Sequence, residues 1–110
     1  MRRDYKLYLQ DVLSAIRKIE KYVGETSFEE FAKDEKTADA VVRNLEIIGE
    51  ATKFMPSEIK RKYSSVEWKK IAGLRDILIH AYFGVDLEIV WDVLKNKLPD
   101  LKKKIEEIIR

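Results

Sequence analysis

Apolar residues recur at intervals of three and four along most of the chain, and no stretch alternates apolar and polar residues with a period of two. The first spacing puts apolar side chains along one face of an α-helix, whereas alternation would indicate a half-buried β-strand. The sequence therefore predicts an all-α fold. Its 110 residues, 45% of them hydrophobic, can supply one core, and we expect a single helical domain over residues 1–110.

Four long helices are expected, arranged as a four-helix up-and-down bundle with short additional helices. The long helices cover residues 9–23, 38–55, 68–79 and 89–108. Gly24 is expected to end the first helix, and Pro56 the second, because proline has no backbone N–H to donate. Pro99 lies inside the fourth segment and is expected to kink or restart that helix.

Polar side chains at several positions are suited to cap these helices. Ser27 and Glu30 form the pattern of a capping box, which opens a short helix. The Ser64–Ser65 pair offers a cap for the third long helix, and Asp86 offers one for the fourth. A second short helix, rich in charge, is expected over residues 57–63.

Composition excludes several classes of protein. The chain has no cysteine, which excludes a disulfide framework, a cysteine-ligated zinc site and thiol catalysis, and which suits the reducing cytoplasm. It has one histidine with no carboxylate pair in ligand spacing beside it and no glycine-rich loop, so neither a metal nor a cofactor is expected. No apolar run approaches the ~20 residues of a membrane span, so no membrane association is expected.

The charges nearly balance, with 22 basic and 20 acidic side chains and a net charge of +2. Composition alone therefore does not demand non-specific binding to long nucleic acids, and any such contact must be local. Basic runs occur at 60–62, 69–70 and 102–104. Runs of this kind are more often the solvated face of a helix than a binding patch.

The segment 73–84 carries three polar groups in an apolar stretch, namely Arg75, His80 and Tyr82. An arginine can hold a phosphate with two hydrogen bonds, and a histidine can move protons near neutral pH. Metal-free RNA cleavage requires a base for the 2′-hydroxyl, stabilisation of charge on phosphorus, and an acid for the departing 5′-oxygen. These residue types therefore suit chemistry on a phosphodiester.

The helical geometry complicates this interpretation. On a straight helix Tyr82 returns to within about 20° of Arg75, whereas His80 lies about 140° away. Asp76 shares a face with His80 and is placed to orient its imidazole. For the side chains of Arg75, His80 and Tyr82 to converge, the helix must end near His80, Arg75 must reach across with its long side chain, or a second subunit must contribute. A two-fold dimer would also supply two imidazoles for the acid and base roles.

Structural interpretations compete with these functional ones. A lone histidine near an apolar face is usually a satisfied structural residue, and an Arg-x4-His spacing arises by chance in helical bundles. Gly49 lies inside the second long helix, where glycine costs roughly 1 kcal/mol relative to alanine, and this indicates close approach by another helix. Glu46 and Glu50 share a face beside it and are interpreted as a solvated or ion-paired surface, or else as part of a site.

The motif Arg75-x4-His80-x-Tyr82 does not stand alone. With it occur the stretches 43–51 (RNLEIIGEA) and 82–86 (YFGVD), the latter followed by an Ile-Val-Trp sequence. Together these motifs resemble the HEPN superfamily, and in particular its HepT-like branch. The resemblance covers nearly the whole chain.

The resemblance implies a homodimeric all-α bundle that acts as a metal-independent ribonuclease toxin on RNA, with tRNA and mRNA both open as substrates. Arg75 and His80 inherit the catalytic roles. Asp76, the supporting residue that its shared face with His80 indicates, stands where many relatives carry asparagine. The implied partner is MntA, a minimal nucleotidyltransferase antitoxin that transfers AMP to the motif tyrosine. Tyr82 inherits this modification, together with a supporting role in the site.

The resemblance also assigns Glu46 and Glu50 to the second motif of the family, as possible site residues. Two other functions stay open at this point. The chain could be a non-catalytic nucleotide-binding partner or substrate of the nucleotidyltransferase, which its near-neutral charge and the poor alignment of His80 with Arg75 would suit. It could also be a helical dimerisation module without further activity.

Overall fold

The computed structural model describes residues 4–79 and 84–110 of the chain, and every regular element in them is helical. The elements are α1 (Tyr5–Val23), α2 (Phe28–Lys33), α3 (Glu35–Lys53), α4 (Ser57–Lys62), α5 (Trp68–Ile79), α6 (Leu87–Asp92), a π-helical turn (Val93–Lys97) and α7 (Leu98–Ile109). The predicted all-α fold is confirmed.

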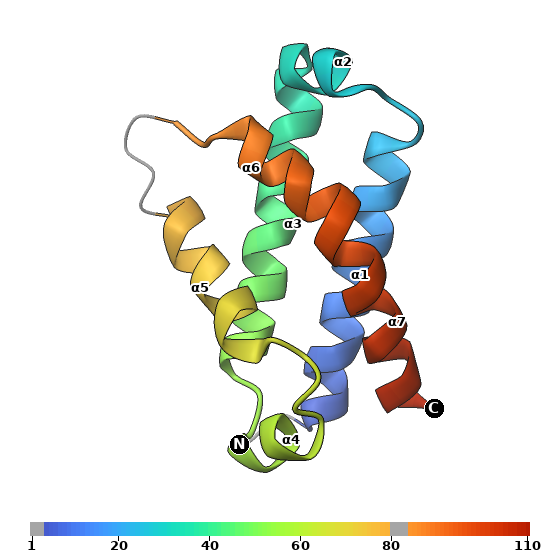
Figure 1. Cartoon of the computed structure of the whole chain (residues 1–110), viewed down its shortest axis with the longest axis vertical. Coiled ribbons are helices and arrows are strands. Elements are labelled where there is room, and N and C mark those ends of the chain that lie inside the picture. The colour runs from blue at the N-terminus through green and yellow to red at the C-terminus, as the bar shows by residue number, and fades with distance from the viewer. Residues whose placement is uncertain (1–3, 80–83) are drawn as a thin grey trace.

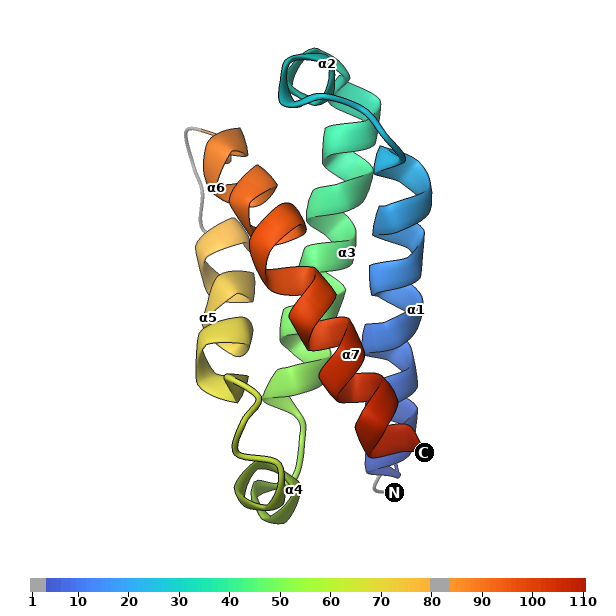
Figure 2. The ribbon, with the colours of Figure 1, turned by 45° about the vertical axis from the view of Figure 1, so that its right-hand side comes forward.

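The long helices alternate in direction, as the bundle prediction requires. Figure 1 shows α1 and α5 running up the molecule and α3 and the α6–α7 segment running down. The two short helices α2 and α4 lie at opposite ends. In both views α3 lies between α1 and α5, and it packs against each of them (Figure 2). Because α3 packs directly against α5, residues of both helices form any site at their contact.

Most helix ends follow the predicted chemistry. Gly24 ends α1 with a φ of 54°, a conformation that favours glycine. Ser27 and Glu30 form the complete capping box at the start of α2. Asp86 accepts hydrogen bonds from the backbone N–H groups of Glu88 at 2.9 Å and Ile89 at 3.4 Å. These three predictions are confirmed.

The predicted capping of α5 by the Ser64–Ser65 pair is wrong, because the helix begins only at Trp68. The preceding residues form a turn in which the Val66 N–H donates to the Tyr63 carbonyl at 3.1 Å. The buried indole of Trp68 also donates to Tyr63, at 3.0 Å. Burial of Val66 and Trp68 therefore sets the start of α5, and local capping propensity does not.

Pro99 interrupts the last helical segment and restarts it. Residues Val93–Lys97 form a π-helical turn, and the Leu98 N–H donates to the Val93 carbonyl five residues earlier. Pro99 lies in the first turn of α7, where its missing N–H leaves no helical bond unmade. The wide turn just before it fits the space that the proline ring requires. The predicted restart is confirmed.

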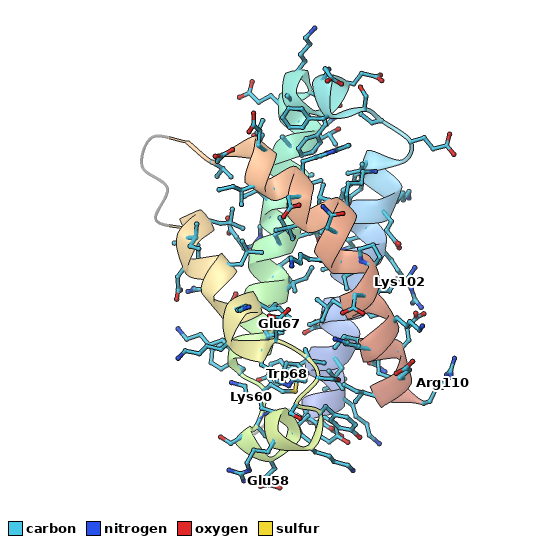
Figure 3. All side chains as sticks on the ribbon, in the orientation of Figure 1. Glu58, Lys60, Glu67, Trp68, Lys102 and Arg110 are labelled. Carbon is cyan, nitrogen blue, oxygen red and sulfur yellow. The ribbon has the colours of Figure 1, made fainter. Side chains whose placement is uncertain are left out.

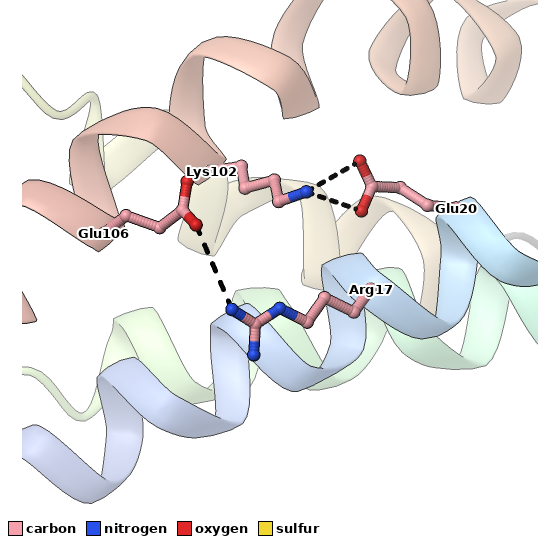
Figure 4. Close-up of polar contacts among 4 residues, drawn as sticks. All are labelled: Arg17, Glu20, Lys102 and Glu106. Atoms are coloured by element: carbon pink, nitrogen blue, oxygen red, sulfur yellow. Dashed lines mark hydrogen bonds and ion pairs between the residues drawn. The ribbon is translucent and has the colours of Figure 1, made fainter.

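The core is apolar and shared by all the long helices. Its largest fully buried side chains are Phe31, Leu9, Ile16, Leu45, Ile48 and Ile105. Two ion pairs join α1 to α7 at the surface, as Figure 4 shows: Lys102 with Glu20 at 2.9 Å, and Arg17 with Glu106 at 3.9 Å. Exposed pairs of this kind contribute at most about 1 kcal/mol, so apolar burial holds the bundle together. No helix in the described parts of the chain is both long and apolar enough to cross a membrane.

Candidate functional site

Arg75 lies on the face of α5 that packs against α3. A Cβ atom built on Gly49 of α3 would lie 2.5 Å from the Cβ of Arg75 and 3.1 Å from its backbone nitrogen. Real Cβ atoms do not approach that closely, so only glycine fits at position 49 with α5 in this place. The predicted close approach at Gly49 is confirmed, and the residue that approaches is the candidate catalytic arginine itself.

The guanidinium group of Arg75 is partly buried and only partly bonded. Its side chain is 26% exposed, and its Nη1 donates to Asp76 Oδ1 at 3.2 Å. Its Nε is buried and meets no acceptor in residues 4–79 and 84–110. A buried donor without a partner costs free energy, which a hydrogen bond to an acceptor would recover.

The other two motif residues, His80 and Tyr82, fall outside the described residues. They directly follow Ile79, the last residue of α5, and precede Gly84, where the description resumes. The predicted pairing of Asp76 with His80 is untested for the same reason. Within the described residues Asp76 bonds instead to the neighbouring Arg75.

The two glutamates of α3 differ in their surroundings. Glu46 is half-buried and pairs with Arg43 at 3.6 Å, whereas Glu50 is exposed. Neither forms a hydrogen bond or ion pair with Arg75 in the structure as described. The ion pair of Glu46 with Arg43 fits the interpretation of this face as an ion-paired surface. A role in the site for Glu46 or Glu50 stays a prediction.

Sequence reasoning missed three exposed apolar side chains near the motif in the chain. The side chains of Ile77 and Ile79 on α5 are 66% and 44% exposed, and Ile89 on α6 is 54% exposed. Their apolar nature is plain in the sequence, but only the packing of α5 shows which of its apolar residues remain uncovered. Among the described residues no three His, Asp or Glu side chains gather as a metal would require.

The contact between Gly49 and Arg75 generates a prediction about stability. In Gly49→Ala the added methyl group meets the α5 backbone, and we expect a loss of about 1–3 kcal/mol, typical of overpacking. Gly73→Ala, on α5, is the matched control, because a Cβ atom there meets nothing within 4 Å. Alanine should stabilise that helix by up to about 1 kcal/mol. Urea unfolding of both variants measures the difference, and equal stabilities would contradict the close contact.

Comparison with known proteins agrees with the motif. The family model described as "Ribonuclease HepT-like" matches residues 12–108. A "Probable ribonuclease HepT" of Thermococcus cleftensis is 47% identical over 108 residues, which are 98% of this chain and 98% of that protein. A "Putative RNase" of Methanocaldococcus jannaschii is 47% identical over 109 residues, 99% of this chain and 90% of its own length.

A third relative, a "Putative RNase" of Caldanaerobacter subterraneus subsp. tengcongensis, is 46% identical over 103 residues, which are 94% of this chain and 92% of that protein. No solved structure matches the chain. Because the family model and these relatives span nearly the whole sequence, the chain belongs to the HepT-like ribonuclease family.

Proposed function

We propose that the protein is a metal-independent endoribonuclease in which Arg75 and His80 act on the scissile phosphodiester. The observation that carries the proposal is the state of Arg75. Its backbone is held against Gly49, and its buried Nε has no acceptor among the described residues. The chain's only histidine follows five residues later. Membership of the HepT-like ribonuclease family supports the same reaction.

In the proposed reaction the 2′-oxygen of the ribose attacks phosphorus, and the bond from phosphorus to the 5′-oxygen breaks. His80 accepts the proton of the 2′-hydroxyl, and an imidazolium donates a proton to the departing 5′-oxygen. The guanidinium of Arg75 stabilises the negative charge that builds up on the phosphoryl oxygens. Asp76 acts as a positioning residue, because its carboxylate already accepts a hydrogen bond from that guanidinium.

The acid and base roles call for two imidazoles, and the proposed homodimer supplies the second. The support for a dimer is the exposure of three apolar side chains, Ile77, Ile79 and Ile89, which lie close to the motif in the chain. Burial of such residues against a second copy is favourable by roughly 25 cal/mol per Å² of apolar surface. A two-fold axis near this surface would bring the two motif copies together.

A change at this surface tests the dimer. Ile77→Glu places a charge in the proposed interface, and we expect the protein to sediment as a monomer and to lose most RNA cleavage. Leu7→Glu is the control, because Leu7 is also exposed, at 43%, but lies on α1. Sedimentation equilibrium measures both variants. A dimer that survives Ile77→Glu would move the interface to another face of the bundle.

Catalysis is tested by RNA cleavage in EDTA with unmodified protein, whose mass is checked first. His80→Ala should slow cleavage by about 10²- to 10⁴-fold, the range for loss of an acid–base group. Arg75→Ala should slow it by about 10²- to 10³-fold, and Arg75→Lys should not restore it fully, because lysine lacks the planar fork. Arg17→Ala, a surface change on α1, should leave cleavage unchanged. An unmodified wild-type dimer that cleaves neither tRNA nor mRNA would favour a non-catalytic partner of a nucleotidyltransferase.

We further propose that the protein is the toxin of a toxin–antitoxin pair in the cytoplasm, neutralised by an MntA-like nucleotidyltransferase. In this step the phenolic oxygen of Tyr82 attacks the α-phosphorus of ATP, and pyrophosphate leaves. The attached AMP brings a phosphate charge close to Arg75, where it would occupy the guanidinium and exclude RNA. The support is the position of Tyr82, two residues beyond His80 in the motif.

Incubation with such a nucleotidyltransferase and ATP tests this role. The mass of the wild type should rise by AMP units, and Tyr82→Phe should show no gain. Tyr22→Phe is the control, because Tyr22 is 43% exposed on α1 and lies far from the motif in the chain. Unmodified Tyr82→Phe should also cleave RNA roughly tenfold more slowly, since it loses one hydrogen bond to phosphate worth about 1.5 kcal/mol. Unchanged cleavage would confine Tyr82 to regulation.

A further inference from the structure

A hollow of about 880 Å³ lies beside the amino-terminal half of α5. Residues from the end of α3, from α4, from the turn after it and from α5 line this hollow. Its charged lining residues are Lys53, Lys60, Lys69, Lys70, Glu67 and Asp76. Figure 3 shows Lys60, Glu67 and Trp68 close together where the base of α5 faces α4. Segments that are separate in the sequence thus form one surface.

The positive charges of this hollow are only partly neutralised. Lys70 pairs with Glu67 at 2.8 Å, and this hydrogen bond is the main reason why the pKa of Glu67 lies below its ordinary value. Glu67 is therefore ionised at neutral pH and offsets Lys70. Lys53, Lys60 and Lys69 form no ion pair or side-chain hydrogen bond within the described residues. We call these three residues the lysine groove.

The lysine groove reaches Asp76, the residue that directly follows Arg75. Asp76 lines the same hollow, and its carboxylate is the group that binds the guanidinium of Arg75 at 3.2 Å. Gly73, one turn earlier on α5, also lines it and leaves it open, since a Cβ atom there would meet nothing within 4 Å. A strand held at Arg75 can therefore extend along α5 toward α4.

The groove is suited to a phosphate backbone and poorly suited to reading bases. Trp68 lines it, but its ring is buried and its Nε1 already donates to the Tyr63 carbonyl, so it offers no free face for stacking. Lysines act as point charges on phosphates and fix the register of a strand without selecting its sequence. Three unpaired lysines in an open hollow fit that role.

We propose that the lysine groove binds the sugar-phosphate backbone of the RNA strand that flanks the scissile bond. This inference rests on the proposed ribonuclease function, and it adds where the substrate lies on the protein. Lys53, Lys60 and Lys69 each contact a phosphate, and Arg75 receives the scissile one. Since these contacts carry no sequence information, any preference for particular bases arises outside the groove.

Binding of a fluorescent single-stranded RNA tests the groove without relying on cleavage. The protein is the full-length His80→Ala variant, and Kd is measured over a range of salt concentrations. Lys53→Gln, Lys60→Gln and Lys69→Gln are introduced together. Loss of three phosphate contacts should lower the slope of log Kd against log salt by about 2, because each contact to a single strand contributes about 0.7. At low salt Kd should rise more than tenfold.

The matched control replaces three exposed lysines elsewhere, Lys18, Lys21 and Lys103, by glutamine in the same background. The net charge changes equally in the two triple variants. Lys21 lies in the last turn of α1, as Lys53 and Lys60 lie in the last turns of α3 and α4, so the control matches one of the two changes at helix ends. The control should bind RNA within about twofold of its parent. Equal losses in the two triple variants would overturn the proposal and leave only a general charge effect.

Cleavage kinetics separate this proposal from the catalytic one. With His80 intact, the groove variant should raise KM and leave kcat within about twofold, since contacts away from the reacting atoms bind substrate and transition state alike. If the groove variant is active with the KM and the salt slope of the parent, the groove proposal is overturned and the catalytic proposal stands. Groove-dependent binding in a wild type that does not cleave would support the groove and reject catalysis. Lost binding of the nucleotidyltransferase with unchanged RNA binding would assign the lysines to a protein partner instead.

Stability measurements keep these tests interpretable. Both triple variants should unfold at the same urea concentration as the parent, because their lysines lie on the surface. Should the groove variant be unstable, the single change Lys69→Gln, at an exposed position on α5, gives the same test with a smaller expected slope change of about 0.7. A slope equal to that of the parent would then reject a phosphate contact at Lys69.

Discussion

The close approach of α3 and α5 at Gly49 and Arg75 is the contact on which the rest of the site depends. A side chain at position 49 would overlap the Cβ atom of Arg75, so glycine allows the two helices to pack with the arginine between them. In this arrangement the Nε atom of Arg75 is buried, while its Nη1 donates to Asp76. The guanidinium is thus partly buried and its Nε has no acceptor among the described residues, which supports the proposal that this arginine binds an anion.

One helix therefore contributes to both proposed sites, the arginine site and the lysine groove. The α3-facing side of α5 places Arg75, and its amino-terminal half forms a wall of the basic hollow with α4. Asp76 belongs to both, because it lines the hollow and holds the guanidinium. A phosphate chain entering along the lysines would thus arrive at the arginine. The short helix α4 and the turn after it, whose Val66 also belongs to the core, help to form this path.

Much of the fold could be predicted from local patterns. Spacing of apolar residues predicted the long helices, Ser27 and Asp86 predicted helix starts, and Pro99 predicted the restart into α7. These features follow from neighbouring residues, and so a sequence shows them. The start of α5 at Trp68 agrees with the apolar spacing, but its cap was mispredicted, because burial of Val66 and Trp68 overrides the capping propensity of the serine pair. Gly49 predicted that another helix approaches closely, but the sequence does not say which helix that is.

By itself, the sequence determined the helical class, the order and direction of the helices, and the family-specific run from Arg75 to Tyr82. Tertiary structure decided what surrounds Arg75, and it decided that lysines from α3, α4 and α5 share one hollow. In the sequence the runs that contain Lys60 and Lys69 are indistinguishable from ordinary solvated helix faces. The physical reason is that charge acts through space: only the packing of distant segments determines which like charges meet and which are left without a partner.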